Sequence, residues 1–392
     1  NEIMRILWVN PSFLDYRVPV YKRLYELTNG DFYIVFSEKR VPERVIKKMK
    51  DAIGENAIVY KGEKVLELWN RKGMNHKYLG IPFTFGLYKL IKNVNADIVI
   101  AEGFFQWTPK AVYYSFWHKK PLLIAYERTK HTERFCPKWR LIYRQMIDKF
   151  ATGYLCNGKL TKEYLMSIGV KKEKCFMGGM SADSKGLVCG ISKMSEEQKK
   201  ENELGIIGNG ITYLYVGRMT ECKGVIYLLR AWAKHKEKHQ NDHLLLVGGG
   251  ELLEEFIAEF GHERSIHFVG EINYDEIYKY YVVANIFVIP TLEDNWSLVV
   301  PEAMACGLPI ACSIYNGCYP ELCIEGENGV LFDPLKEETI LEALDKFHHI
   351  DLNEYGKNSI EIEEEYNFEH VSKKIYDACL QTYIKTKKDN ER

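Results

Sequence analysis

The stretch "VGRMTECKGVIYLLRAW", Val216 to Trp232, joins a strand pattern to a helix pattern and decides the fold of this chain. An apolar run, "ITYLYVG", leads into it, and its apolar residues then recur every three or four positions, as on one face of a helix. We therefore expect a strand near 211–217, a turn at 217–224 and a helix after it. The apolar residues at helical spacing are Val225, Leu228, Leu229 and Trp232.

Similar apolar runs of strand length recur along the whole chain. They are apolar throughout rather than alternating, which is what a parallel sheet covered by helices on both faces requires. The pattern predicts an α/β protein with two doubly wound, Rossmann-like units. The runs are "RILWVN", "FYIVFS", "ADIVIAEG", "PLLIAYE" and "GYLCNG" in the first half, and "ITYLYVG", "HLLLVGGG", "SIHFVG", "NIFVIPT", "LPIACS" and "GVLF" in the second.

A stretch that is first Gly/Ser-rich and then charged, 178–210, separates the two sets of runs. We place a first domain at 1–183, a linker at 184–210 and a second domain at 211–367. The remaining segment, 368–392, has the pattern of an amphipathic helix.

The formal net charge of −1 hides two halves of opposite sign. Residues 1–200 contain 36 Lys and Arg against 20 Asp and Glu, a net charge of +16, whereas the rest of the chain contains 17 against 34, a net charge of −17. The basic half indicates an anionic partner, such as a membrane surface or a phosphate-bearing acceptor. Attraction between the two domains explains the same pattern. No RNA-binding motif accompanies the excess, so nucleic acid is not expected.

Cysteine usage and hydropathy indicate a cytosolic protein. The ten cysteines are scattered over 392 residues without a short-spaced framework, which favours reduced thiols over disulfides or a zinc site. No apolar run approaches the roughly 18 residues that a membrane helix needs, and the start "NEIMRILWVN" lacks a signal-peptide pattern. We expect no exported or membrane-spanning segment.

The turn after the opening strand combines two cations with a helix N-terminus. Arg218 and Lys223 follow the strand, and free backbone N–H groups begin the helix. Ligands of doubly wound sheets bind beyond the carboxyl ends of the strands, so the turn predicts an anion site, most economically for a diphosphate. The alternative is a surface arginine and lysine beside an ordinary loop.

A second polar loop follows another predicted strand, in "TLEDNWSLVVPEAMACGLPIACS", residues 291–313. Ser297 has the place of an N-cap for a helix that begins near Leu298 or Val299, which would leave amide groups available to phosphate oxygens. Glu302 falls one turn later, where its carboxylate could accept hydrogen bonds from a ribose diol. A capped helix with an incidental glutamate is the alternative.

Taken together, these segments resemble the nucleotide-binding half of GT-B glycosyltransferases of the retaining family-four type. The resemblance runs through about residues 211–335 and rests on five segments in order: "GRMTECKG", "LLLVGGGELLEEF", "VGEI", "VIPTLEDNWSLVVPEAMACGLPIACS" and "ENGVLFDP". It implies two Rossmann-like domains that face each other across a cleft, with the helix at 368–392 crossing back to the first. It also implies a UDP- or GDP-sugar donor, no other cofactor and no metal.

The resemblance assigns roles to residues of the second half. Arg218 and Lys223 would hold the diphosphate, Glu302 the ribose, and Glu271 and Ile272 would lie near the base. The family has Glu-x7-Glu where this chain has Asp294 before Glu302, and that first acid faces the donor sugar; Glu293 is a possible substitute for it. The remaining implied donor contacts are Gly217, Gly249, Asn295, Trp296, Ser297, Leu298 and Val299, of which Asn295–Ser297 replace the usual Gly-Phe-Gly.

The first half resembles the family less closely, as expected of an acceptor domain. Its first loop, "NPSFLDYRVPVYKRL", replaces the usual glycine-rich loop, and "YERTKHTER", 126–134, resembles a motif of some surface-polysaccharide members. From the latter we take Glu127 and His131 as the ionisable candidates, with a solvated or structural histidine as the alternative. Glu102 follows another strand and is a third carboxylate of the same kind. The first loop offers Asn10, Asp15, Tyr16 and Arg17 for acceptor or phosphate contact.

The resemblance implies a retaining glycosyltransferase that acts on a glycan or lipid-linked acceptor in surface-polysaccharide or glycolipid synthesis. Arg218, Lys223 and the helix after Ser297 would stabilise the leaving diphosphate. We expect it in the cytoplasm, with peripheral contact to the inner membrane face through the basic half. The alternatives are a catalytically impaired sugar-nucleotide-binding protein and a dehydrogenase, although "VGGGE" at 247–251 lacks the GxGxxG order. The polar segment with His235, His239 and His243 predicts a solvated helix end rather than a metal site.

Overall fold

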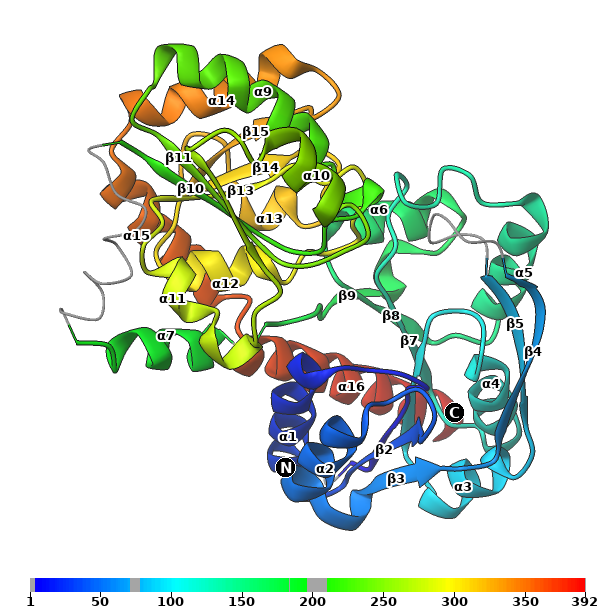
Figure 1. The fold of residues 1–392 in the computed structure, drawn as a ribbon. Coiled ribbons are helices and arrows are strands. Elements are labelled where there is room, and N and C mark those ends of the chain that lie inside the picture. Colours follow the sequence, from blue (N-terminus) through cyan, green and yellow to red (C-terminus); the bar gives the residue numbers. More distant parts are fainter. Residues whose placement is uncertain (1–3, 71–77, 183, 196–209, 392) are drawn as a thin grey trace. The chain divides into compact units, whose positions relative to one another are not determined.

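The computed structural model describes residues 4–70, 78–182, 184–195 and 210–391, which fold as two compact units (Figure 1). Unit 1 comprises Asn1–Ser181 together with Phe368–Arg392, and unit 2 comprises Ala182–Asn367. Each unit has its own parallel sheet with helices on both faces. The prediction of two doubly wound α/β units is therefore confirmed.

Unit 1 is built on a seven-stranded sheet in the order β3-β2-β1-β6-β7-β8-β9, with every pairing parallel. An antiparallel hairpin of β4 (Glu63–Asn70) and β5 (Tyr78–Thr84) accompanies it. The sheet strands are β1 (Ile6–Val9), β2 (Phe32–Ser37), β3 (Ala57–Tyr60), β6 (Ile98–Glu102), β7 (Leu122–Tyr126), β8 (Gly153–Cys156) and β9 (Cys175–Met177). The helices are α1 (Val18–Leu27), α2 (Glu43–Ile53), α3 (Leu87–Val94), α4 (Thr108–His118), α5 (Lys138–Asp148) and α6 (Lys159–Ser167).

Both faces of this sheet are buried, which explains why its strands are apolar throughout. In β1, Leu7 and Val9 pack into one cluster, whereas Ile6 and Trp8 pack into the cluster on the other face. Successive strand residues point to opposite faces, so a strand buried on both sides needs apolar residues at every position.

The last helix, α16 (Phe368–Glu391), belongs to unit 1 although it follows unit 2 in the sequence. Its Ile375 and Cys379 are buried in the same cluster as Tyr21 and Leu24 of α1. The hydroxyl of Ser372 donates to the carbonyl of Val20 at 3.3 Å. The apolar face of the C-terminal helix is thus covered by the first helix of the chain.

Unit 2 has a six-stranded parallel sheet in the order β12-β11-β10-β13-β14-β15. Its core includes Tyr213 and Tyr215 of β10 together with Leu228 and Trp232 of α9. The strands are β10 (Thr212–Val216), β11 (His243–Val247), β12 (Ile266–Gly270), β13 (Ile286–Ile289), β14 (Ile310–Ser313) and β15 (Gly329–Phe332). The helices are α7 (Ser184–Ser192), α9 (Val225–Lys238), α10 (Leu253–Phe260), α11 (Tyr278–Tyr281), α12 (Val299–Ala305), α13 (Tyr319–Leu322), α14 (Glu337–Lys346) and α15 (Leu352–Glu364).

The predicted linker, 184–210, needs a correction in its first part. Residues Ser184–Ser192 form α7, which packs in unit 2 instead of running free. Ser184 is buried and donates to Glu363 Oε1 at 2.7 Å, and Leu187 is buried as well. The Gly/Ser-rich composition of the segment did not indicate this helix. Residues 196–209 of the predicted linker lie outside the described residues.

Among the described residues, no helix combines the length and the apolar character that crossing a bilayer requires.

Candidate functional site

The loops that carry the predicted donor residues are neighbours at the carboxyl ends of the strands of unit 2, where the strand order reverses. The strand order proceeds from β10 to β11 and β12 on one side and from β10 to β13, β14 and β15 on the other. The crevice beyond the carboxyl ends of β10 and β13 is therefore the topological switch point, where doubly wound folds bind ligands. Lys223 follows β10, and Asp294 follows β13.

Lys223 and Asp294 meet there, 71 residues apart in the sequence, with the ammonium of Lys223 paired to Oδ2 of Asp294. The backbones of the two loops are joined as well, because Leu292 N donates to the carbonyl of Cys222 at 2.8 Å. Both side chains of the ion pair are mostly buried, with 25% of Lys223 and 14% of Asp294 exposed. The structure thus brings the predicted cation and the predicted acid into one site.

Asp294 also organises its own loop. Its Oδ1 accepts a hydrogen bond from Trp296 N at 3.0 Å, and its Oδ2 accepts one from the hydroxyl of Ser297 at 2.7 Å. Asn316 holds Ser297 in turn, because its Nδ2 donates to Ser297 Oγ at 3.0 Å. Asn316 is fully buried, and the sequence analysis missed it.

The expected N-cap role of Ser297 is wrong. The helix α12 begins at Val299 with Leu298 as its N-cap residue, and no side chain caps it. The Ser297 hydroxyl donates to the Asp294 carboxylate instead, and its oxygen accepts from Asn316 Nδ2 rather than from an N–H group of the helix. Val300 N donates to the carbonyl of Ser297, and no side chain among the described residues bonds to the N–H groups of Leu298 and Val299, as an anion-binding helix end requires.

Two glycines allow the neighbouring loops to approach closely. Gly224 has φ of 65°, and a Cβ on it would lie 2.2 Å from the carbonyl oxygen of Pro290 at the end of β13. Gly248 has φ of 138°, and a Cβ there would lie 1.9 Å from the oxygen of Gly217. Both positions combine a backbone that L residues rarely adopt with a contact that leaves no room for a side chain.

The predicted base-binding residues lie at the same edge. Gly249 follows β11 and accepts a hydrogen bond from Met219 N at 2.7 Å, which links it to the loop after β10. A Cβ on Gly249 would lie 3.3 Å from Oε2 of Glu271 after β12, so Gly249 and Glu271 are close neighbours. Ile272 is half-buried beside it.

Glu302 lies on α12, buried and held by two tyrosines. Its Oε1 accepts from the hydroxyl of Tyr274 at 2.9 Å and its Oε2 accepts from the hydroxyl of Tyr281 at 3.0 Å. Burial raises the pKa of Tyr281 well above its ordinary value, so this hydroxyl stays protonated and donates. No local sequence pattern had indicated either tyrosine.

The other predicted donor contacts differ in exposure. Arg218 is exposed, and no other described residue forms an ion pair with its guanidinium. Trp296 is 3% exposed, and its ring lies 6.1 Å from that of Tyr366, so its side chain packs in unit 2 rather than at the surface. Leu298 and Val299 are half-buried.

In unit 1, Glu102 and Asn10 occupy the corresponding switch point, because β1 pairs with both β2 and β6. Oε1 of Glu102 accepts from Trp8 Nε1 at 3.0 Å and from Asn10 Nδ2 at 3.2 Å, and it lies 3.6 Å from Arg17 Nη2. Burial raises the pKa of Glu102, and the buried Arg17 offsets part of that shift. Burial also raises the pKa of Tyr16.

Asp15 does not join this cluster. Its carboxylate is paired with Arg44 Nη2 and Lys48 Nζ of α2, each at 2.8 Å. Burial opposes ionisation, but the two cations outweigh it and hold the pKa of Asp15 below its ordinary value. Asp15 therefore anchors the loop to α2, whereas Asn10 and Arg17 from the same loop contact Glu102.

The loop with Glu127 and His131 is held by a buried ionic cluster that the sequence analysis missed. Arg144 Nη2 pairs with Glu133 Oε2 at 2.9 Å, and both side chains are almost fully buried. Arg128 Nε pairs with Oε1 of the same glutamate at 3.2 Å. Glu127 and His131 are half-buried in this loop.

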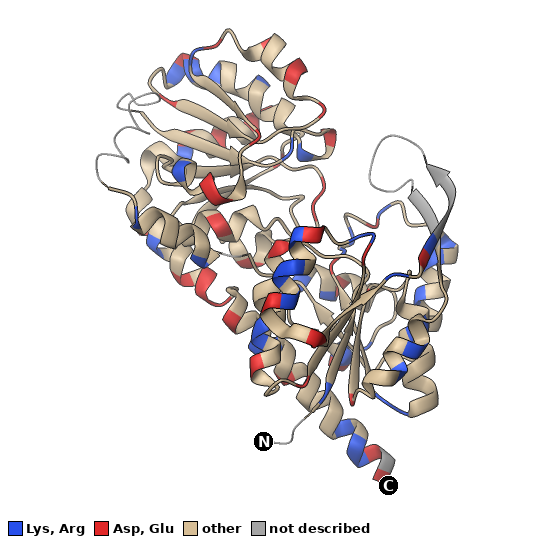
Figure 2. Cartoon of the chain, turned by 60° about the horizontal axis from the view of Figure 1, so that its bottom comes forward, with Lys and Arg blue, Asp and Glu red and all other residues tan. Residues whose placement is uncertain are grey.

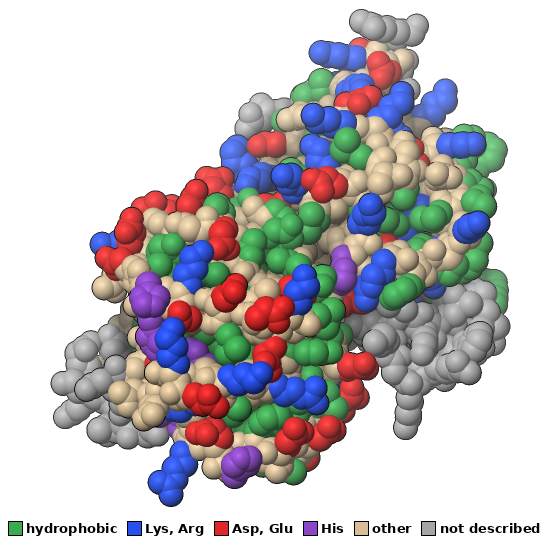
Figure 3. Space-filling model, turned by 90° about the horizontal axis from the view of Figure 1, so that it is seen from above, with side chains coloured by type: hydrophobic (Ala, Val, Ile, Leu, Met, Phe, Trp, Pro, Cys, Tyr) green, Lys and Arg blue, Asp and Glu red, His purple; other side chains and the backbone are tan. Residues whose placement is uncertain are grey.

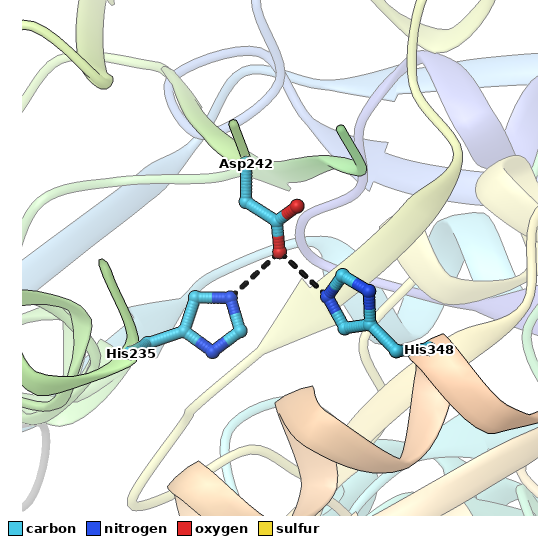
Figure 4. Close-up of side chains that lie close together, drawn as sticks. All are labelled: His235, Asp242 and His348. Carbon is cyan, nitrogen blue, oxygen red and sulfur yellow. Dashed lines mark hydrogen bonds and ion pairs between the residues drawn. The ribbon is translucent and has the colours of Figure 1, made fainter. Parts of the chain in front are cut away.

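One group of described side chains has the composition and spacing of metal ligands (Figure 4). His235 Nε2 and His348 Nε2 lie 2.7 Å and 2.8 Å from the same oxygen, Oδ2 of Asp242. The expectation of a solvated helix end is therefore wrong for His235, which is 2% exposed. It continues the apolar stripe of Leu228 and Trp232 at helical spacing, which is the sequence feature that could have revealed its burial. The distances are those of hydrogen bonds from two imidazoles to one carboxylate.

Comparison with solved structures defines the class of fold. The chain is similar to Anabaena Alr3699/HepE, solved in complex with UDP and glucose, with a TM-score of 0.71 and 16% identity over 95% of this chain and 98% of that one. It is equally similar to a glycosyltransferase of Rickettsia africae, with a TM-score of 0.71 and 15% identity over 97% and 99% of the two chains. The chain has the GT-B fold.

Sequence comparison then gives the family of the segment that contains the unit 2 site. Residues 196–362 match the glycosyl transferases group 1 family, and this part of the chain is a domain of that family. An uncharacterized glycosyltransferase of Methanocaldococcus jannaschii is 28% identical over 238 residues, which are 57% of this chain and 60% of the relative. A D-inositol 3-phosphate glycosyltransferase of Corynebacterium jeikeium is 30% identical over 159 residues, which are 38% of each chain. The chain thus spans 60% or less of the length of these relatives.

Proposed function

We propose that this protein is a retaining glycosyltransferase that uses a nucleotide-diphosphate sugar as donor. The observation that supports the proposal most strongly is the meeting of Lys223 and Asp294 at the switch point of unit 2. A lysine in this place can exchange its carboxylate partner for the diphosphate of a donor. Similarity to a protein solved with UDP, and in another crystal with UDP-glucose, favours a UDP-sugar over a GDP-sugar.

The proposed chemistry at unit 2 depends on charge. Breaking the anomeric C–O bond leaves negative charge on the diphosphate, and fixed cations and N–H dipoles stabilise it most. Arg218, Lys223 and the uncapped start of α12 are the groups that supply this stabilisation, without a metal in the proposed mechanism. Glu302 would bind the ribose, and Asp294 would face the donor sugar after Lys223 has moved to the phosphates.

The proposed acceptor binds unit 1 and is a glycan or lipid-linked sugar of surface-polysaccharide or glycolipid synthesis. Glu102 is the carboxylate best suited to an acceptor hydroxyl, because burial raises its pKa and Arg17 orients it. Glu127 and His131 are further candidates on a loop held by Glu133. Similarity to a lipopolysaccharide outer core galactosyltransferase supports this class of product. We propose a cytoplasmic location, with the basic half next to the inner membrane face.

One observation favours a second candidate, a sugar-nucleotide-binding protein with impaired catalysis. The carboxylate of Asp294 is engaged by Lys223, Ser297 and the Trp296 amide, so little of it is left for a sugar hydroxyl. Such a protein would bind the donor and leave it intact, both with acceptor and without.

Thermal stabilisation by a panel of UDP-, GDP-, ADP- and CMP-sugars and free diphosphates tests the donor site, because a ligand that binds only the native state raises its melting temperature. A selective shift that is lost in Lys223→Ala and Arg218→Ala, but kept in the exposed control Arg230→Ala, supports the proposal. The absence of a shift with every nucleotide would overturn it. Release of free nucleotide from the selected donor then separates the transferase from the impaired binder.

A further inference from the structure

Unit 1 exposes an unusual number of large apolar side chains on α4 and α5. Seven of them, which we call the α4–α5 apolar surface, are each between 42% and 66% exposed. Single exposed apolar residues are ordinary, but a continuous group needs an explanation. The surface consists of Tyr113, Phe116, Trp117, Trp139, Ile142, Met146 and Phe150.

The members of this surface are in contact on α4 and between α4 and Phe150, and those on α5 share one side of that helix. On α4, the ring of Trp117 lies 6.1 Å from that of Tyr113 and 5.7 Å from that of Phe116. The ring of Phe116 lies 5.7 Å from that of Phe150, just beyond the end of α5. Phe150 and Met146 are four residues apart and lie on one side of the chain, so the exposed rings of α4 lead into those of α5.

Helix α5 has apolar side chains on its outward side as well as on its inward side. Trp139, Ile142 and Met146 recur at helical spacing and face outward, whereas Ile147 and Arg144 face inward and are 5% and 3% exposed. In the interior of unit 1, Arg144 forms an ion pair with Glu133. The helix therefore carries a second apolar stripe on its outward side, which is expected if another apolar phase covers that stripe.

The extent of this surface is at the upper end of what a monomer in water usually presents. Aromatic side chains have about 150–250 Å² of surface each, and roughly half of each member is exposed here. The seven side chains then present on the order of 600 Å² of apolar area, at the upper end of the largest patches found on typical monomers. Figure 3 shows hydrophobic side chains reaching the surface among lysines and arginines in this unit.

The charge around the surface identifies its partner. Residues 108–150 contain ten Lys and Arg against three Asp and Glu, and the helices of unit 1 show many of these basic positions in Figure 2. Two of the three acids, Glu133 and Asp148, already have cationic partners within the unit. The exposed lysines nearest in sequence to the apolar side chains are Lys110, Lys119, Lys138 and Lys149.

We propose that the α4–α5 apolar surface docks on an anionic lipid bilayer, with its aromatic side chains at the level of the headgroups. Tryptophan, tyrosine and phenylalanine beside lysines are the composition of helices that lie in the membrane interface plane. The lysines would add attraction to anionic headgroups. A second copy of this chain is a poorer partner, because its cationic border would repel an identical border. The proposal rests on the proposed location of the basic half at the membrane face and does not depend on the donor site of unit 2.

Flotation of the purified full chain with vesicles tests the proposal. Vesicles of phosphatidylcholine alone are compared with vesicles that also contain phosphatidylglycerol, at low and at high salt. We expect binding to the mixed vesicles, weaker binding at high salt, and a blue shift of tryptophan emission on binding, because Trp117 and Trp139 would leave water. Failure to bind the mixed vesicles would overturn the proposal, whatever the donor assay shows.

Variants assign the binding to this surface. Trp117→Ser combined with Trp139→Ser should weaken vesicle binding by about tenfold or more, and Lys138→Gln combined with Lys149→Gln should remove most of the preference for phosphatidylglycerol. Leu335→Ser combined with Ile257→Ser removes exposed apolar residues from unit 2 and should change nothing. All variants should keep the wild-type melting temperature and nucleotide response.

Two results would contradict the assignment. Equal vesicle binding by the tryptophan variant and the wild type would mean that another surface contacts the bilayer. A wild-type dimer that becomes monomeric in the tryptophan variant, with no vesicle binding by either protein, would mean that the surface joins two copies.

Discussion

Lys223 is neutralised by Asp294 before any anion arrives, because the two side chains form an ion pair across the loops after β10 and β13. A diphosphate that binds Lys223 must therefore compete with a carboxylate of the same protein. The pair is mostly buried, so the competition is less screened by solvent than at the surface.

Asp294→Asn should tighten the binding of free UDP or GDP by about tenfold, because the lysine then has no competing carboxylate. Lys223→Ala should weaken it by a similar factor. Titration calorimetry at low ionic strength measures both. Glu293→Gln is the matched control, since it removes the same charge from the adjacent position; an equal gain in this control would show that net charge, rather than the ion pair, limits affinity.

Tyr281→Phe should weaken donor binding severalfold and lower the stability of unit 2 by about 1 kcal/mol, the typical net contribution of one hydrogen bond. Its hydroxyl orients Glu302, and its loss leaves one carboxylate oxygen of Glu302 without that donor. Chemical denaturation and nucleotide titration measure the two effects. Tyr280→Phe removes a hydroxyl from the same short helix and serves as the control. If the affinity for the nucleotide were unchanged in Tyr281→Phe, Glu302 would not be the residue that binds the ribose.

Arg144→Met should lower the free energy of unfolding of unit 1 by about 3 kcal/mol, because the buried carboxylate of Glu133 then loses one of its cationic partners. For a unit of this size the loss corresponds to a fall of about 6–12 °C in Tm. The double variant Arg144→Met/Glu133→Gln should recover part of the loss, since the buried charge is then removed as well. The exposed Lys130→Met is the control. Strictly additive losses in the double variant would contradict the coupling of the pair.

Unit 2 should lose stability as the pH falls from about 7 to 5. Burial lowers the pKa of His235, His243 and His267, so the folded state binds fewer protons than the unfolded chain below the ordinary histidine value of about 6.5. The neutral forms therefore stabilise the fold above that value, and this contribution is lost as the pH decreases. Melting curves over this range measure it.

His235→Asn should reduce the slope of Tm against pH, whereas His349→Asn, which changes an exposed histidine of the same unit, should leave the slope as it is. His235 is surrounded by Asp242, His239 and His348, so the reduction should be partial. A slope that is identical in His235→Asn and wild type would assign the pH dependence to the pair His243 and His267.

The two parallel sheets could be predicted from the sequence because their strands are apolar throughout. The positions of Lys223 and Asp294 at the ends of two strands could be predicted as well, because a strand and the loop after it are adjacent in the sequence. Ser297 was assigned the wrong role, since the same hydroxyl fits a helix cap and a carboxylate partner, and only the loop geometry decides between them. Tyr274, Tyr281 and Asn316 contribute through contacts between distant segments, which no local spacing encodes.

The direction of α5 shows a second limit of sequence patterns. Periodicity reveals that Trp139, Ile142 and Met146 share one face of the helix, but it does not state whether that face lies inside or outside. The burial of Arg144 depends on Glu133, which precedes the helix, and on the aromatic rings of Phe104 and Tyr126 around its guanidinium. Which side of α5 lies inside therefore follows from tertiary contacts.

The close fit at Gly224 and Gly248 constrains how the donor site can be re-engineered. Since the loop after β10 touches Pro290 on one side and the loop after β11 on the other, with no space for a β-carbon, a single loop grafted from a relative would collide with its neighbours. Libraries intended to change donor preference should therefore exchange the three loops as one block, or keep all three backbones and vary only side chains such as Asn295 that do not set the approach.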